Sequence, residues 1–271
     1  MGADTVVADV ADELARRVAA GQYRPGELMP SVRQVAEEFE MNRATAQLTL
    51  GRLESYGFVS ARRGKGFTIH DVRAVGGLEV YRHLFRFSLD RPDLAVAMFG
   101  DIVAAERELV REALLGYTAS ERAVDRAELA AMVAELETLA RQQPPDHRRV
   151  LAAEVALIRR LFTAMDTSLR RAVFNSVAEM VLEVPEAVRA YFAAPAELHA
   201  LMWRALLSVW DSGTPPSPAQ SALFDELFDN YHRRVLARFR ELVAGGAATA
   251  PVTTAPVTTA PVAPAARAAT G

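Results

Sequence analysis

The stretch that organises this sequence is PSVRQVAEEFEMNRATAQLTLGRLESYGFV, residues 30–59. Ser31 can cap a helix that runs to about residue 39, because a serine side chain accepts a hydrogen bond from the free N–H groups of a first helical turn. Asn42 can cap a second helix over residues 43–56 in the same way. Gly57 suits the position just after a helix end. The stretch therefore predicts a helix, a tight turn and a second helix.

The second helix is expected to expose two polar side chains. Arg43 and Gln47 lie four residues apart, on the face opposite an apolar stripe of Ala46, Leu50, Leu53 and Tyr56. Short strands are expected at residues 58–60 and 67–69, on either side of the basic turn RRGKG at residues 62–66. Between residues 42 and 66 there are five basic residues and one acidic residue, Glu54. Such a helix, backed by a basic wing, is suited to contacting DNA bases and phosphates.

The composition of the whole chain limits the possible functions. It has 271 residues and a net charge of −3, so nucleic-acid binding would have to come from a local basic patch. There are no cysteines, which excludes disulfides and thiolate metal sites. No run approaches the roughly 18 apolar residues of a membrane helix, and the first residues lack the pattern of a signal peptide. We therefore expect a soluble, cytoplasmic protein with no membrane partner.

The apolar pattern divides the chain into four parts. Residues 1–73 form the winged helix-turn-helix, with a further one-faced helix at 5–21, and residues 74–80 (with AVGG at 74–77) form a hinge. Residues 81–243 form an all-α bundle, with helices expected at 92–115, 125–142, 146–164, 168–183, 186–192, 196–210 and 217–243. Residues 244–271 are rich in Ala, Pro, Thr and Val and repeat PVTTA, so they form a disordered tail. The fold class is mostly α with a small β wing.

The order of these motifs resembles the GntR family of winged helix-turn-helix repressors. The family pattern is P-G-x-x-L-P-S-E-R-x-L-A, S-R-x-T-V-R, L-x-x-x-G-L and G-x-G-T-x-V. This chain has PGELMPSVRQVA at 25–36, NRATAQ at 42–47, LESYGFV at 53–59 and GKGF at 64–67. The resemblance covers residues 5–71. It departs from the pattern at four positions, which are Met29, Val32, Asn42 and Gln47.

The resemblance implies which side chains face double-stranded DNA. It places Arg33, Arg43, Thr45 and Gln47 against the duplex, with Lys65 at the wing tip in the minor groove. Together with the helix cap and the basic turn, the candidate DNA-binding residues are Arg33, Asn42, Arg43, Thr45, Gln47, Arg62, Arg63 and Lys65. Glutamine prefers adenine edges and arginine prefers guanine. Because Gln47 replaces an arginine of the family pattern, we expect an operator that differs from the family's usual one.

The bundle resembles the FadR-type effector and dimerisation domain of this family. Many such domains hold a metal with one Asp and three His, the first in a D-x-x-F-H-R-x-L helix. Aligning that pattern with EVALIRRL at 154–161 puts Ile158 at the place of the first His, while His199 and His232 fall near the later two. We therefore predict no metal and no other cofactor. His199 and His232 are then either structural histidines or residues of an effector pocket.

The remaining motifs bear on the effector and on catalysis. The stretch PEAVRAYFAAP at 185–195 resembles the corresponding stretch of fatty-acid-responsive members. This resemblance implies an apolar or acyl-CoA-like effector, such as acyl-CoA or another carboxylate metabolite. The sequence has no Gly-rich phosphate loop and no G-x-S-x-G elbow. We therefore expect that the protein is not an enzyme.

These features predict a DNA-binding transcription regulator, which in this family is most often a repressor. It would bind a palindromic operator as a homodimer, since one helix-turn-helix reads a half-site, and a small-molecule effector in the bundle would control its DNA affinity. The alternative is an effector-independent architectural or partner-recruiting DNA-binding protein. In that case the bundle would only hold the dimer together, and the tail would recruit partners.

Overall fold

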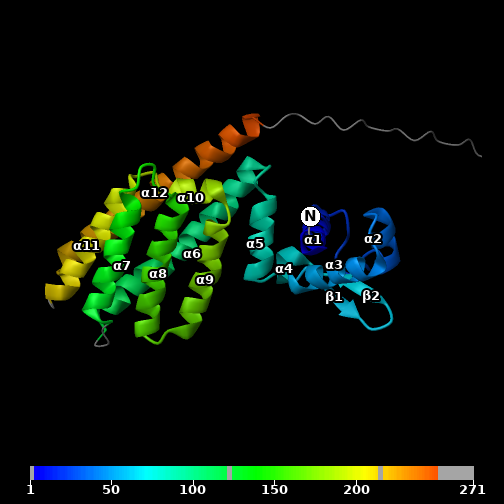
Figure 1. Cartoon of the computed structure of the whole chain (residues 1–271), viewed down its shortest axis with the longest axis horizontal. Coiled ribbons are helices and arrows are strands. Elements are labelled where there is room, and N and C mark those ends of the chain that lie inside the picture. The colour runs from blue at the N-terminus through cyan, green and yellow to red at the C-terminus, as the bar shows by residue number, and fades with distance from the viewer. Residues whose placement is uncertain (1–2, 121–123, 213–215, 250–271) are drawn as a thin grey trace, which may run out of the picture.

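The computed structural model describes residues 3–120, 124–212 and 216–249. A small domain with a two-stranded sheet lies at one end, and a helical bundle lies at the other (Figure 1). The expected fold class, mostly α with a small β wing, is confirmed. Within the described residues, no helix is both long enough and apolar enough to cross a membrane.

The N-terminal domain packs three helices against a hairpin. Its elements are α1 (Ala3–Ala19), α2 (Val32–Glu38), α3 (Arg43–Ser55), β1 (Val59–Arg62) and β2 (Gly66–Ile69). The two strands are antiparallel, with Val59 opposite Ile69. Leu14 of α1, Val35 of α2 and Leu50 of α3 are completely buried between them. Each helix therefore contributes an apolar stripe to one core, as the sequence pattern predicts.

The predicted helix caps are present. The Ser31 side chain accepts a hydrogen bond from the Gln34 backbone N–H at 3.3 Å, and the Gln34 side chain accepts from the Ser31 N–H at 2.9 Å. This reciprocal pair is a capping box. After α3, Gly57 adopts φ of +88°, which L side chains rarely adopt. The turn into the wing therefore requires glycine at this position.

The hinge predicted at residues 74–80 contains parts of two helices and stays a prediction. Two helices lie there, α4 (Val72–Val75) and α5 (Leu78–Phe87), and only two glycines separate them. A Cβ on Gly76 would lie 2.3 Å from the Val72 carbonyl oxygen, so the link is tight. Val80 of α5 is buried in the core of the N-terminal domain. The paired glycines allow a close helix-to-helix turn in place of a loose linker.

The bundle contains the helices that the apolar pattern predicts, with ends shifted by a few residues. They are α6 (Pro92–Thr118), α7 (Arg126–Ala140), α8 (His147–Ala164), α9 (Ser168–Leu182), α10 (Pro185–Tyr191), α11 (Ala196–Ser212) and α12 (Pro218–Thr249). The last helix corrects the predicted start of the tail at residue 244, because it continues to Thr249. Alanine, the strongest helix former, permits that continuation. The rest of the predicted tail, 250–271, lies outside the described residues.

Helix α5 joins the two domains (Figure 1). On the bundle side, the rings of Phe85 and Phe99 are stacked with centroids 6.0 Å apart, and Phe239 of α12 lies 4.0 Å from Phe99. On the other side, Arg86 forms an ion pair with Asp12 of α1 at 2.9 Å. Helix α5 thus contributes side chains to the core of each domain, so a shift of α5 would disturb the packing of both.

Candidate nucleic-acid interface and ligand cavity

The exposed face of α3 carries the side chains that the sequence places against DNA. Arg43 and Gln47 are both exposed, while Ala46, Leu50 and Leu53 on the opposite face are completely buried. Arg43 forms no ion pair with any residue that the structure describes. Its guanidinium is therefore free to contact a base edge or a phosphate.

The sequence pattern missed an apolar residue on the same face. Leu48 follows Gln47 and is 64% exposed, an unusual position for a leucine, and Ala44 is exposed one turn earlier. Alanine and other small apolar groups can contact the methyl group of thymine in the major groove. The exposure of Leu48 could have been predicted, because Leu48 lies outside the apolar stripe of Ala46, Leu50 and Leu53.

Asn42 and Thr45 bond to each other at the start of α3. The Asn42 side-chain oxygen accepts hydrogen bonds from the Thr45 backbone N–H at 2.9 Å and from the Thr45 hydroxyl at 3.1 Å. Both side chains thus fix the first turn of the helix, whose N-terminal end attracts phosphate groups. Their direct contact with DNA stays a prediction. Arg33 is exposed and lies 3.6 Å from Glu37, a pair too exposed to hold it in place.

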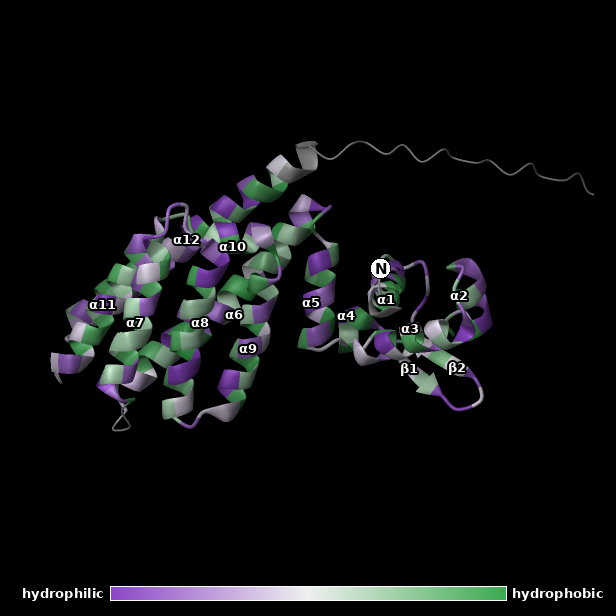
Figure 2. Ribbon diagram, in the orientation of Figure 1, coloured by the Kyte–Doolittle hydropathy of each residue, from purple (hydrophilic) through white to green (hydrophobic). Residues whose placement is uncertain are grey.

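The wing presents a basic loop and is anchored by the single acidic residue of this region. Arg62, Arg63 and Lys65 are all exposed, and Figure 2 shows the loop between β1 and β2 as hydrophilic. The Glu54 carboxylate accepts a hydrogen bond from the Ala61 backbone N–H at 2.6 Å. Because Glu54 belongs to α3, this bond holds the wing at a set angle to the recognition helix.

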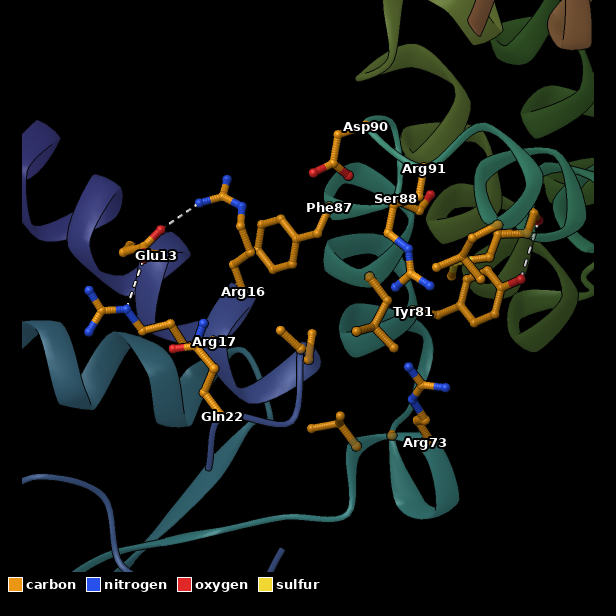
Figure 3. A pocket seen from close by; sticks show the side chains of 17 residues that line it. Glu13, Arg16, Arg17, Gln22, Arg73, Tyr81, Phe87, Ser88, Asp90 and Arg91 are labelled. Atoms are coloured by element: carbon orange, nitrogen blue, oxygen red, sulfur yellow. Dashed lines mark hydrogen bonds and ion pairs between the residues drawn. The ribbon is translucent and has the colours of Figure 1, made fainter. Parts of the chain in front are cut away.

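A cavity of about 460 Å³ lies where the two domains meet (Figure 3). Arg16 and Arg17 of α1 form one wall, and Phe87 and Arg91 lie on the other. Arg16 forms an ion pair with Glu13 at 2.9 Å, and its guanidinium lies 4.9 Å from the centre of the Phe87 ring. Since both domains supply its walls, the cavity must change shape whenever the domains move relative to each other.

A buried histidine lies in the same junction. His83 is 1% exposed, its ring centroid is 3.9 Å from that of Tyr56, and neither ring nitrogen has a hydrogen-bond partner among the described residues. Burial lowers the pKa of His83, and Arg86 and Arg82 lower it further. Asp12 and Glu79, on α1 and α5, oppose that shift, and burial outweighs them. The junction therefore favours the neutral imidazole.

We expect His83 to make the fold less stable in mild acid. Because its pKa is lower in the folded chain than in the unfolded chain, the unfolded chain binds the extra proton first as the pH falls through about 6.5. The free energy of unfolding should therefore decrease below that pH, by about 1.4 kcal/mol for each unit of pKa difference. Urea denaturation between pH 7.5 and 5.5 measures this decrease.

The variant His83→Gln should show a smaller decrease over the same pH range. His70→Gln is the matched control, because His70 lies in the same domain and bonds the Gly57 carbonyl at 2.9 Å. If His83→Gln loses stability with falling pH as steeply as the wild-type chain does, the junction histidine is not the cause.

A second cavity, of about 520 Å³, lies in the bundle and is lined by residues of α6, α8, α9, α10, α11 and α12. It brings together His199 and His232, the two candidate effector residues, with Glu106 and Glu154. The rest of the lining is mainly apolar or aromatic, and includes Leu114, Ile158, Phe174, Met202, Trp203 and Phe228. The volume and character suit a small organic ligand.

Glu154 binds two side chains of α11. Its carboxylate accepts hydrogen bonds from Nδ1 of His199 at 3.0 Å and from Nε1 of Trp203 at 3.1 Å. Burial lowers the pKa of His199, but the charge and hydrogen bond of Glu154 outweigh burial and raise that pKa overall, with help from the Tyr191 carbonyl. The two residues thus form a buried acid–imidazole pair at one end of the cavity.

Glu106 forms a second pair of the same kind. One carboxylate oxygen accepts hydrogen bonds from the Tyr191 hydroxyl at 3.1 Å and from Nε2 of His232 at 3.2 Å. Nδ1 of His232 lies 2.8 Å from the Phe228 carbonyl oxygen, and only an imidazole with a proton on each nitrogen can donate to both of these acceptors. Neither pairing could be read from the sequence, because the partners lie on different helices far apart along the chain.

The side chains do not fit the one-Asp, three-His metal set that the resemblance implies. Ile158 offers no ligand atom and is buried in the cavity wall. His199 and His232 each bond a different glutamate, and the described residues contain no cluster of three or more His, Asp or Glu that could hold a metal. The prediction of no metal thus gains a physical reason, although it stays a prediction.

The charges in the cavity argue against the carboxylate effector expected from the sequence. Among its lining residues in the described part of the chain there is no arginine or lysine, and two glutamates are present. An arginine or lysine is the usual partner of a buried carboxylate or phosphate. The apolar character expected for the effector fits this cavity, and the negative head group does not.

The N-terminal domain is similar in sequence to the DNA-binding domains of known regulators. A family model described as "Bacterial regulatory proteins, gntR family" matches residues 7–69. The chain is 36% identical over 83 residues to the HTH-type transcriptional regulator Mce2R of Mycobacterium tuberculosis, covering 30% of this chain and 35% of that protein. It is 37% identical over 57 residues to the uncharacterized HTH-type transcriptional regulator YhcF of Bacillus subtilis, covering 21% of this chain and 47% of that protein.

These matches span less than half the length of the curated relatives. Among solved structures, the chain is similar to that of Lar, which is described as controlling the expression of the Listeria monocytogenes agr system. The TM-score is 0.43 at 13% identity, over 92% of this chain and 98% of that one.

Proposed function

Because residues 7–69 are a GntR-type helix-turn-helix domain, we propose that this protein is a transcription regulator that binds a palindromic operator as a homodimer. A small molecule in the bundle cavity would set its affinity for that operator, and repression is the expected outcome. The protein would act on the chromosome in the cytoplasm. The matching domain family is described as regulatory proteins, and the curated relatives are transcriptional regulators, not enzymes.

The observation that carries this proposal is the exposed face of α3. Arg43, Gln47 and Leu48 project from a helix whose opposite face is buried, and the basic wing follows directly. A helix of this kind enters the major groove and reads a few base pairs. One domain therefore recognises too short a sequence to select a single site in a genome, and a second copy is needed.

Exposed apolar side chains of the bundle support association of two copies. Leu201 of α11 and Leu223 of α12 are 60% and 55% exposed. Leu198 and Leu227, on the same two helices, are also exposed but line the cavity of about 520 Å³. Exposed apolar patches of this kind are usually covered by another protein surface. This feature supports a homodimer formed through the helical domain.

Helix α5 supplies the connection that an effector needs. A ligand can change DNA affinity only by favouring one arrangement of the two domains over another. Arg82 of α5 binds Glu183, at the end of α9, at 2.9 Å, while Arg86 of α5 binds Asp12 of α1. The cavity of about 520 Å³ in the same bundle favours this regulated protein over an effector-independent architectural one.

Selection of bound duplexes from a random DNA pool tests the proposal. With the full-length chain, we expect the enriched sequences to share an inverted repeat whose half-sites are about one helical turn apart. Sedimentation of the protein with that duplex should then show two chains for each duplex. Enrichment of a single half-site, or no enrichment at all, would contradict the proposed dimeric operator.

A further inference from the structure

We propose that the bundle cavity binds a lipophilic cation, which is an apolar molecule with a protonated amine or quaternary ammonium group. This assignment rests on the proposed use of the cavity as an effector site, and it names the class of ligand. It also differs from the carboxylate expected from the sequence. Three features of the cavity carry it, which are its charge, the accessibility of its polar atoms and its aromatic walls.

The first feature is the net charge of the lining. Among the lining residues that the structure describes, the carboxylic acids are Glu106 and Glu154, and the basic side chains are the imidazoles of His199 and His232. With both glutamates ionised and His232 donating from both of its ring nitrogens, the lining has a net charge of −1 when His199 is neutral and no net charge when His199 is protonated. As long as both glutamates are ionised, the net charge of the lining is therefore never positive. A buried anion would therefore lack a compensating charge and would lie near two carboxylates, both of which are costly.

The second feature is which polar atoms a ligand can reach. The side chains of Glu106 and Glu154 are 15% and 12% exposed, whereas those of His232 and His199 are 5% and 6% exposed. The histidines are therefore more deeply buried than the acids that they bind. A ligand group that bonds these carboxylates meets oxygens that only accept hydrogen bonds when ionised. It must therefore supply donors, as an ammonium group does.

The third feature is the aromatic content of the walls. The aromatic lining residues are Phe174, Tyr191, Trp203, Phe224, Phe228 and Tyr231. The face of an aromatic ring attracts a cation, and tryptophan does so most strongly. The same rings bury the apolar body of the ligand, which supplies most of the binding free energy. Carboxylates and aromatic rings thus both favour positive charge on an otherwise apolar molecule.

Three ligands with the same alkyl chain separate the effect of charge from that of apolar contact. Decylamine, decanol and decanoate carry a positive, a neutral and a negative head group at neutral pH. Isothermal titration of each into the full-length chain, without DNA, measures the dissociation constants. We expect decylamine to bind roughly 10- to 100-fold more tightly than decanol, as for a hydrogen bond to a charged group, and decanoate to bind most weakly.

The variant Glu106→Gln tests whether the cavity carboxylate is responsible. It should remove most of the preference for decylamine over decanol while leaving the affinity for decanol unchanged. The matched control is Glu108→Gln, because Glu108 is on the same helix but its side chain is 65% exposed and pairs with Arg107. If Glu106→Gln does not fold, as judged by thermal denaturation, Glu154→Gln replaces it with the same expected result.

Several outcomes would overturn the assignment. It fails if decanoate binds as tightly as decylamine, if all three ligands bind equally, if none binds, or if Glu106→Gln retains the full preference. A decylamine complex that leaves operator affinity unchanged would instead contradict the proposed regulation of DNA binding. The class of ligand and the regulatory role are thus tested separately.

Discussion

Replacing Arg43 with alanine is expected to weaken binding to the selected operator by about 1–3 kcal/mol, which is roughly 10- to 100-fold. The guanidinium is exposed at the first position of the recognition helix and has no described ion-pair partner to hold it elsewhere. Because the side chain makes no contribution to the core, the loss should come from the DNA contact alone. Fluorescence anisotropy with a labelled duplex measures it.

Arg52→Ala is the matched control for this substitution. Arg52 is on the same helix and is also exposed, but helical geometry puts it on the side opposite Arg43. Its Nε atom donates a hydrogen bond to the Tyr56 hydroxyl at 2.8 Å. We expect Arg52→Ala to leave specific affinity nearly unchanged. Equal affinity of wild-type and Arg43→Ala chains for the operator would show that α3 does not read DNA through this residue.

Replacing Phe239 with alanine is expected to lower the free energy of unfolding by about 3–5 kcal/mol, the usual cost of deleting a buried aromatic ring. Phe239 of α12 is completely buried, and its ring lies 4.0 Å from Phe99 and 6.0 Å from Phe85. The substitution leaves a void between α5, α6 and α12. Urea denaturation followed by circular dichroism measures the change.

Arg240→Ala controls for the loss of a long side chain from α12, because Arg240 is the next residue and is exposed. Its effect should stay within about 0.5 kcal/mol. A loss below about 1 kcal/mol for Phe239→Ala would mean that the end of α12 is not firmly packed on the bundle. That result would also weaken the case for a connection through α5.

Phe239 lies on a series of contacts between the cavity and the DNA-binding domain. Helix α12 lines the cavity through Phe228 and His232 and contacts α5 through Phe239. Helix α5 in turn contacts α1 through Arg86 and Asp12. Helix α1 packs against the recognition helix α3, so these contacts join the cavity to the DNA-binding domain in an unbroken series. This is a continuous physical route, and the operator assay with and without ligand measures whether it is used.

The parts that sequence patterns located correctly depend on neighbouring residues. The Ser31 and Asn42 caps bond N–H groups three residues ahead, and the wing turn lies within a few residues of its own strands. The apolar stripes of the bundle repeat with the helical period. The form of the link at residues 74–80 is not a local property, because two adjacent glycines permit either a loose linker or a close turn. The choice between them depends on Val80, which packs into the core of the N-terminal domain.

The sequence by itself therefore determined that this chain presents a DNA-reading helix and wing on a helical bundle, because caps, turns and helical faces are local properties. Only the tertiary structure decided what the bundle cavity can hold. Glu154 meets His199 across 45 residues of sequence, and Glu106 meets His232 across 126. No local pattern records such pairs, and they set the charge of the cavity. Because of this charge, we propose a cationic ligand in place of the carboxylate that the sequence led us to expect.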